Sequence, residues 1–261
     1  MCQFKSGIIL KDRVFIPDYD SHTDMLQKLK IEDTEENARR LFVRAELIPP
    51  NNDVFAPVSS WKYCVDQDIL PEWYVAEVDE RRMREAVTEW AKEHIHIDEK
   101  IKEINSGTHW IKDGEIGKIC GSADIRNICG SAEVGGICGS AKVGNIFGSA
   151  EVGNICDSAN IRNIYGSAKV GDICDFAEVG GICGSAKVGN IFGSAKVGNI
   201  YDSAEVGEIY DSATATIPGL VNWEHTKSVC IKDNAVLIDR YNKKIYHSGA
   251  FETVIAGGKR K

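Results

Sequence analysis

The sequence predicts a β-solenoid that lies between a small α+β domain and a short β-rich cap. A nine-residue unit, for example Gly-Ser-Ala-Lys-Val-Gly-Asn-Ile-Phe, recurs without a gap from residue 121 to residue 210. The segments before and after these units have no such period. Short repeats that cannot bury their own apolar side stack on one another. The predicted domains are therefore an α+β domain over 1–106, a solenoid over 107–219 and a β-rich cap over 220–261.

The repeat itself predicts short strands separated by corners. In the unit from Gly139 (position 1) to Phe147 (position 9), positions 3, 5 and 8 are small or branched apolar residues, and position 4 is charged or polar. This in–out pattern is typical of a strand. The glycine at position 6 predicts one turn, and Gly-Ser at positions 1 and 2 predicts the next corner. Nine residues are too few to close a coil, so two units are expected to form each 18-residue coil. Ten full units and two worn copies then predict about six coils.

An 18-residue coil would place position 4 of alternate units in vertical columns, where opposite charges contribute a few tenths of a kcal/mol per pair, as an order of magnitude. The acidic members Glu133, Glu151 and Glu178 are the predicted acidic binding face. One column is expected to hold Asp124, Lys142, Asn160, Glu178, Lys196 and Thr214. The other is expected to hold Glu115, Glu133, Glu151, Lys169, Lys187 and Glu205.

Position 9 holds only cysteine or an aromatic residue in the ten full units. Two interpretations stay open, namely exposed apolar ladders that bind a partner, or side chains packed at the corner. A line of cysteines spaced along strands lacks the close pairs of structural zinc sites. The calcium-binding turn Gly-Gly-x-Gly-x-Asp is also missing, so no metal or cofactor is expected. The candidate binding residues at position 9 are Phe147, Tyr165, Tyr201, Phe192 and Tyr210.

The segments outside the repeats mix both periodicities. Ser21-His22-Thr23-Asp24 is a capping-box pattern ahead of a short helix, and Thr34 can cap a second one. In the N-terminal region the patterns predict a hairpin over 7–16, helices over 21–29, 34–40 and 77–104, and strands over 41–47 and 61–65. In the C-terminal region they predict strands over 228–231, 235–240 and 244–248.

Only a weak carboxylate cluster suggests chemistry. Asp66 and Asp68 are two residues apart and share one face of a strand, and Glu46 lies on another predicted strand. Such a group can hold a divalent ion or perform acid–base work, but a solvated strand end is the alternative interpretation. The sequence contains no phosphate-binding glycine loop, no Gly-x-Ser-x-Gly elbow and no His-Glu-x-x-His motif. We therefore expect no catalytic residue.

Charge and cysteine content favour an acidic protein of a reducing compartment. The formal net charge is −8, divided as −7 over 1–110 (15 basic, 22 acidic), −5 over 111–219 (8 and 13) and +4 over 220–261 (8 and 4). An acidic stack disfavours nonspecific nucleic-acid binding. No apolar run approaches the roughly 20 residues that span a bilayer, and no secretion signal is recognisable. With an odd number of cysteines, nine, the chain is expected to be cytoplasmic.

The strings FVRAELIPP and WKYCVDQDILPEWY, the opening residues 1–26 and the Ser-Ala-x-Val repeats together resemble a family of uncharacterised proteins of bacteria and their phages. The resemblance implies a mobile-element origin and transfers no functional residue. The expected function is a non-enzymatic protein-binding module that blocks host machinery, such as a defence nuclease complex of the CRISPR type. One alternative is a self-assembling structural solenoid that forms a homo-oligomer. The other is a metal-dependent enzyme that uses the carboxylate cluster.

Overall fold

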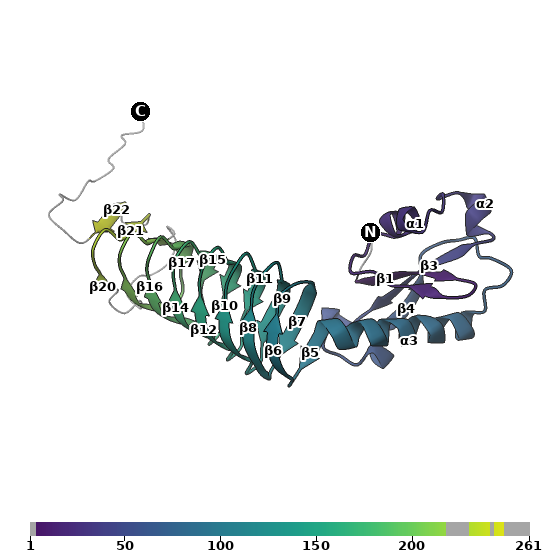
Figure 1. The fold of residues 1–261 in the computed structure, drawn as a ribbon, viewed down its shortest axis with the longest axis horizontal. Helices are drawn as coiled ribbons and strands as arrows, with labels where there is room; N and C mark the ends of the chain where they lie inside the picture. Colours follow the sequence, from purple (N-terminus) through teal and green to yellow (C-terminus); the bar gives the residue numbers. More distant parts are fainter. Residues whose placement is uncertain (1–3, 218–229, 241–242, 248–261) are drawn as a thin grey trace, which may run out of the picture. The chain divides into compact units, whose positions relative to one another are not determined.

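The computed structural model describes residues 4–217, 230–240 and 243–247. It divides into two compact units, Met1–Ile95 and His96–Lys261. The first is a small sheet with helices, and the second is a stack of parallel coils (Figure 1).

The N-terminal unit is built on a four-stranded antiparallel sheet with the order β2-β1-β3-β4. Ser21 caps α1 by accepting a hydrogen bond from the Asp24 amide at 3.2 Å, and Thr34 caps α2 in the same way. The predicted hairpin, strands and first two helices are confirmed here. The strands are β1 (Lys5–Leu10), β2 (Val14–Phe15), β3 (Phe42–Ile48) and β4 (Lys62–Val65), and the helices are α1 (His22–Lys28), α2 (Glu35–Ala38) and two 3₁₀ turns, η1 (Pro50–Asn52) and η2 (Val58–Ser60).

The long helix α3 (Ala76–His94) packs across this sheet, and β1 approaches it closely at Gly7. A Cβ atom on Gly7 would overlap the Ile16 side chain and would lie 2.9 Å from the Cε atom of Met83. A larger residue at this point of contact between sheet and helix would therefore require the flexible ends of the Ile16 and Met83 side chains to move. A cluster that includes Ile8, Met25 and Phe42 fills the space between the sheet and the first two helices.

The predicted helix over 77–104 is too long, because α3 ends at His94. The next residues form β5 (Ile95–Ile97) and β6 (Lys100–Ile104), and β6 pairs in parallel with β8 (Glu115–Ile119), setting Ile101 opposite Ile116. Inward residues of the repeat, at positions 5 and 8, are three apart, which is also a helical spacing. This shared three-residue spacing is why the predicted helix extends to residue 104. The solenoid therefore begins at about residue 95, and the domain boundary lies there rather than at 106.

The solenoid has two parallel sheets, and strands 18 residues apart pair with each other. The eight-stranded sheet, here called sheet C, has the order β20-β18-β16-β14-β12-β10-β8-β6. The ten-stranded sheet, here called sheet B, has the order β22-β21-β19-β17-β15-β13-β11-β9-β7-β5. The remaining strands of sheet C are β10 (Glu133–Ile137), β12 (Glu151–Ile155), β14 (Lys169–Ile173), β16 (Lys187–Ile191), β18 (Glu205–Ile209) and β20 (Cys230–Ile231). Those of sheet B are β7 (Thr108–Lys112), β9 (Asp124–Cys129), β11 (Lys142–Ile146), β13 (Asn160–Ile164), β15 (Glu178–Ile182), β17 (Lys196–Ile200), β19 (Thr214–Ile217), β21 (Val236–Asp239) and β22 (Lys244–His247).

The two-unit coil of 18 residues is confirmed, with about seven coils rather than six. The additional length comes from both ends. The first coil lies in the segment predicted as helix, and β20 and β21 continue the two sheets in parallel. Only β22 reverses direction and pairs antiparallel with β21. The predicted C-terminal strands thus form, and most of them extend the solenoid. Residues 218–219 of the predicted solenoid, and residues 220–229, 241–242 and 248–261 of the predicted cap, lie outside the described residues.

One small and two branched side chains per unit form a continuous core. Ala141, Val143 and Ile146, at positions 3, 5 and 8, are at most 2% exposed, and the same positions are buried in all ten full units. The predicted in–out pattern is therefore confirmed.

The predicted turn at position 6 is wrong. Position-6 glycines lie inside strands, and the left-handed backbone occurs at position 1, as in Gly139 (φ 65°) and Asp157 (φ 56°). A Cβ on the position-6 residue Gly180 would lie 2.6 Å from the carbonyl oxygen of Arg162, one coil earlier. Glycine at position 6 therefore permits close approach between coils. At the corner, the Asp157 carboxylate accepts a hydrogen bond from the Gly139 amide at 2.9 Å and so links two coils.

An asparagine ladder links successive coils on sheet B. At position 7, the Asn145 side chain donates to Asn127 and accepts from Asn163, both at 3.2 Å. Such ladders of stacked amides stabilise in-register parallel strands.

Replacing Asn145 by alanine should remove both ladder bonds. The free energy of unfolding is expected to fall by about 1–2 kcal/mol, since each net hydrogen bond contributes roughly 0.5–1.5 kcal/mol. Chemical denaturation followed by circular dichroism measures it. Asn154→Ala is the matched control, because Asn154 holds position 7 on sheet C between Gly136 and Asp172 and no side-chain hydrogen bond of Asn154 is seen in the described part of the chain. Equal losses in both variants would contradict a role for the ladder.

Candidate binding surfaces

A shallow trough follows the outer face of sheet C along the stack. It has a volume of about 1140 Å³ and is lined by positions 4, 5 and 6 of every coil from β6 to β18. Position 6 is glycine in each strand from β8 to β18, so no side chain covers the backbone there. The glycines that form this stripe are Gly117, Gly135, Gly153, Gly171, Gly189 and Gly207.

Sheet B differs at the same position. Two of its coils carry Arg126 and Arg162 there, and both residues are exposed. These side chains interrupt the glycine stripe, since they alternate with Gly144 and Gly180 in the same column. The uninterrupted stripe is therefore a property of sheet C.

Charged side chains at position 4 form a rail along the trough, and neighbours of opposite sign pair within the chain. Lys169 lies 2.7 Å from Glu151, and Lys187 lies 3.3 Å from Glu205. These pairs are exposed, so each stabilises the fold by at most about 1 kcal/mol. From the N-terminal end, the rail residues are Lys100, Glu115, Glu133, Glu151, Lys169, Lys187 and Glu205.

Both predicted position-4 columns are confirmed by the strand register. The single acidic face predicted from Glu133, Glu151 and Glu178 does not exist, however. Glu133 and Glu151 are neighbours on sheet C, whereas Glu178 is on sheet B and pairs with Lys196 at 3.3 Å. Successive units alternate between the two sheets, which separates Glu178 from the other two.

The position-9 side chains are half-buried or buried in all ten full units. Phe147 stacks on Tyr165 with ring centroids 5.1 Å apart, and Phe192 stacks on Tyr210 at 4.9 Å. The ring of Tyr201 lies over Gly181, at position 7 of the preceding coil. These side chains are half-buried and stack on one another, which agrees with the packing interpretation. Binding of a partner through them stays a prediction.

Two of the position-9 thiols, those of Cys156 and Cys174, are poor nucleophiles at neutral pH because their pKa values are raised. Burial is the main cause that raises the pKa of Cys174 to about 12, with the Asp175 carboxylate adding to it. Burial also raises the pKa of Cys156. Below these pKa values the thiol stays protonated, and the thiolate is the reactive form.

Tyr165→Ser should destabilise the solenoid by removing the stacked pair with Phe147. We expect a loss of about 1 kcal/mol or more, since aromatic pairs contribute roughly 0.5–1.5 kcal/mol beyond area burial. Thermal and urea unfolding measure this loss. The control is Phe176→Ser, because Phe176 is a 69% exposed corner residue at a position that is serine in the other full units. A larger effect in the control would contradict the packing role of the pair.

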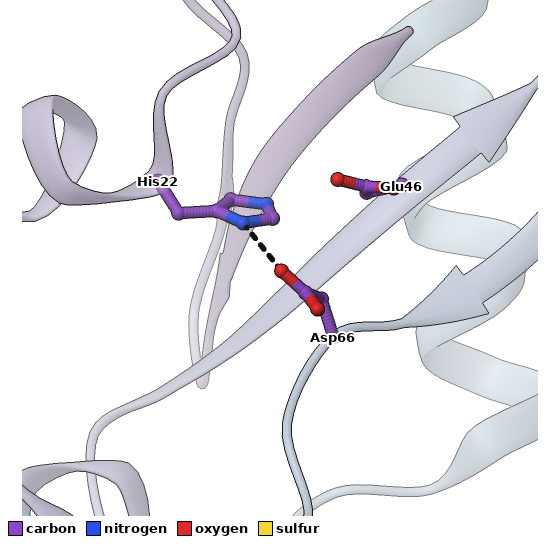
Figure 2. A group of neighbouring side chains, drawn as sticks. All are labelled: His22, Glu46 and Asp66. Atoms are coloured by element: carbon purple, nitrogen blue, oxygen red, sulfur yellow. Dashed lines mark hydrogen bonds and ion pairs between the residues drawn. The ribbon is translucent and has the colours of Figure 1, made fainter. Parts of the chain in front are cut away.

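The N-terminal sheet brings a histidine and two carboxylates together (Figure 2). The Nδ1 atom of His22 lies 3.2 Å from Oδ2 of Asp66, and ligand atoms of His22, Glu46 and Asp66 all lie within 4.8 Å of one another. Of the predicted carboxylate cluster, Glu46 and Asp66 meet, and Asp68 is not part of this group. The sequence pattern does not single out His22 as a candidate ligand. In the sequence, His22 is only part of the capping-box pattern at the start of a helix.

The chain matches no protein-family model, no curated protein and no solved structure. None of the helices in the described residues is both long enough and apolar enough to cross a bilayer.

Proposed function

We propose that this protein is a non-enzymatic protein-binding module that acts through the trough on sheet C. The observation that carries the proposal is the uninterrupted glycine stripe, which leaves backbone open beside a charged rail over six consecutive strands. Stacked repeats typically use such extended surfaces for binding. The glycines also give a partner close access to the sheet, because no side chain stands between them.

The rail favours a protein partner over a nucleic acid. Four of its seven side chains are glutamates, and the three lysines fall in two separate places. The three consecutive glutamates Glu115, Glu133 and Glu151 would repel a polyanion along that part of the trough, although the whole lining, with Lys102, holds as many lysines as glutamates. A polypeptide with alternating blocks of basic and acidic side chains would be complementary to it.

The narrower form of the proposal is a phage or mobile-element protein that binds host machinery in the cytoplasm and blocks it. A defence nuclease complex of the CRISPR type is the proposed target. Two observations support this form, namely the resemblance of the N-terminal strings and repeats, and the formal charge of −5 over residues 111–219 (8 basic, 13 acidic). An acidic surface can compete for a groove that otherwise holds nucleic acid.

Filling the trough should abolish partner binding. Gly153→Arg places a long side chain in the stripe of sheet C, and Gly198→Arg makes the same change at the same repeat position on sheet B. Arg162 shows that sheet B accommodates arginine at position 6, whereas a Cβ on Gly153 would overlap the carbonyl oxygen of Gly135. Circular dichroism therefore has to show that both variants remain folded before binding is compared. In nuclease-treated pull-downs from host cells, we expect Gly153→Arg to recover at least about tenfold less partner, which corresponds to a loss of about 1.4 kcal/mol in binding free energy. Gly198→Arg should recover the partner fully. Equal recovery with both variants would refute the trough as the binding surface.

A second candidate function is self-assembly, and the order of charges along the rail favours it. A two-fold axis parallel to the strands would set two sheet-C faces together with their solenoid axes antiparallel, as isologous dimers require. Centred on Glu151, this arrangement pairs Lys100 with Glu205, Glu115 with Lys187, Glu133 with Lys169 and Glu151 with itself. Opposite charges thus meet everywhere except at the centre.

Light scattering on the purified protein tests self-assembly. A dimer mass that falls to the monomer mass in Gly153→Arg, and persists in Gly198→Arg, would support it. Glu151→Gln should strengthen the dimer, because the substitution removes the single like-charge contact. A monomer mass for the unmodified protein at high micromolar concentration would exclude this arrangement.

A further inference from the structure

We propose that His22, Glu46 and Asp66 form a binding site for a divalent transition-metal ion in the N-terminal unit (Figure 2). The three side chains come from three elements of the fold. His22 is the first residue of α1, Glu46 lies in β3, and Asp66 directly follows β4. This site is independent of the solenoid trough.

The strand register fixes the two carboxylates. The Asp66 amide donates to the Arg44 carbonyl at 2.9 Å, which continues the pairing of β4 with β3 beyond the last strand residue. Asp66 therefore lies opposite Arg44, on the face that Glu46 also shares, because side chains two apart on a strand point the same way. Both carboxylates are positioned by backbone hydrogen bonds.

The hydrogen bonds of His22 leave a ring nitrogen directed at a carboxylate. Its Nε2 lies 3.3 Å from the carbonyl oxygen of Ala45, which only accepts hydrogen bonds, so Nε2 carries a proton. In the neutral ring, Nδ1 then presents its lone pair to Oδ2 of Asp66 at 3.2 Å. Two acceptors at this distance need a positive charge between them. Histidine ligands of metals are typically oriented in this way, with the other nitrogen donating to a backbone carbonyl.

Glu46 adds a buried negative charge. It is 6% exposed, and its hydrogen bond from the Ser6 hydroxyl is long, at 3.5 Å. Among the described residues, no lysine or arginine forms an ion pair with it, and Arg44 on the same face pairs with Asp33. A buried carboxylate without a counter-charge is costly. A bound cation would supply that charge to both carboxylates at once.

The donor set selects the class of ion. One imidazole and two carboxylates suit zinc or manganese, whereas calcium and magnesium prefer oxygen ligands alone. Tetrahedral zinc ligands with bonds of about 2.0–2.2 Å lie about 3.3–3.5 Å apart, close to the separation of His22 and Asp66. Three protein ligands leave one position for water. His22 and Asp66 also line a solvent-open pocket of about 470 Å³, which gives the ion a path of entry.

Binding of Mn²⁺ to the full-length protein tests the site, since manganese avoids the thiols of the repeat. In ¹⁵N-labelled protein freed of metal by a chelator, substoichiometric Mn²⁺ should broaden the amide signals around residues 22, 46 and 66. Asp66→Asn is expected to weaken the apparent affinity about a hundredfold, because even outer-shell substitutions typically cost 10- to 100-fold. Asp68→Asn is the matched control and should bind as the unmodified protein does.

Glu46→Gln gives a second, nearly isosteric variant, and its amide spectrum shows whether the unit stays folded. Selective broadening that is lost in both ligand variants and kept in the control supports the site. Broadening that is equal in Asp66→Asn and Asp68→Asn, or no selective broadening at millimolar Mn²⁺, would overturn it. Nδ1 of His22 would then be only a hydrogen-bond partner of Asp66.

Discussion

The backbone hydrogen-bond ladder between coils is the constraint on which the solenoid depends. From β8 to β18, each strand pairs in parallel with the strand 18 residues away, so each side chain lies directly above its equivalent in the next coil. This register explains the asparagine ladder, the stacked aromatic pairs and the ion pairs between coils. It also explains glycine at position 6, where the backbones approach too closely for a Cβ on most coils. A single repeat of strand, corner and strand therefore specifies all of these contacts.

The same steric requirement produces the candidate binding surface. Glycine at position 6 is a packing device within the stack, yet on sheet C it also clears a continuous stripe of backbone. On sheet B, Arg126 and Arg162 occupy that place in two coils, which makes the two faces chemically different. Because odd and even units supply different sheets, substitutions confined to alternate units change one face only. That independence is how a repeat protein can acquire a specific surface without altering its core.

In the N-terminal unit, by contrast, the candidate site is formed by residues that are far apart in the sequence. His22, Glu46 and Asp66 are far apart in sequence and meet only because β3 and β4 pair while α1 packs against β1. Their mutual arrangement of one nitrogen and two carboxylates resembles the donor sets of transition-metal sites. In the solenoid, His96 lies 2.9 Å from Glu99 and 3.1 Å from His109, but the ligand atoms of these three side chains do not all come within 4.8 Å of one another. The solenoid's Cys156, Asp157 and Asp175 group uses both carboxylates to accept backbone amides between coils.

The sequence by itself determined the solenoid, its 18-residue coil, the buried positions 3, 5 and 8 and both charge columns, because a strict period repeats one local environment many times. It also determined the caps at Ser21 and Thr34, which depend on neighbouring residues alone. Tertiary structure decided where helix α3 ends, after His94, and the first coil of the solenoid begins. Inward residues three apart fit both a helix and a strand, and only the pairing of β6 with β8 favours the strand. It likewise decided the role of position 6, the half-buried state of position 9 and the group around His22. Each of these depends on which distant backbone lies alongside, and a local pattern does not encode that.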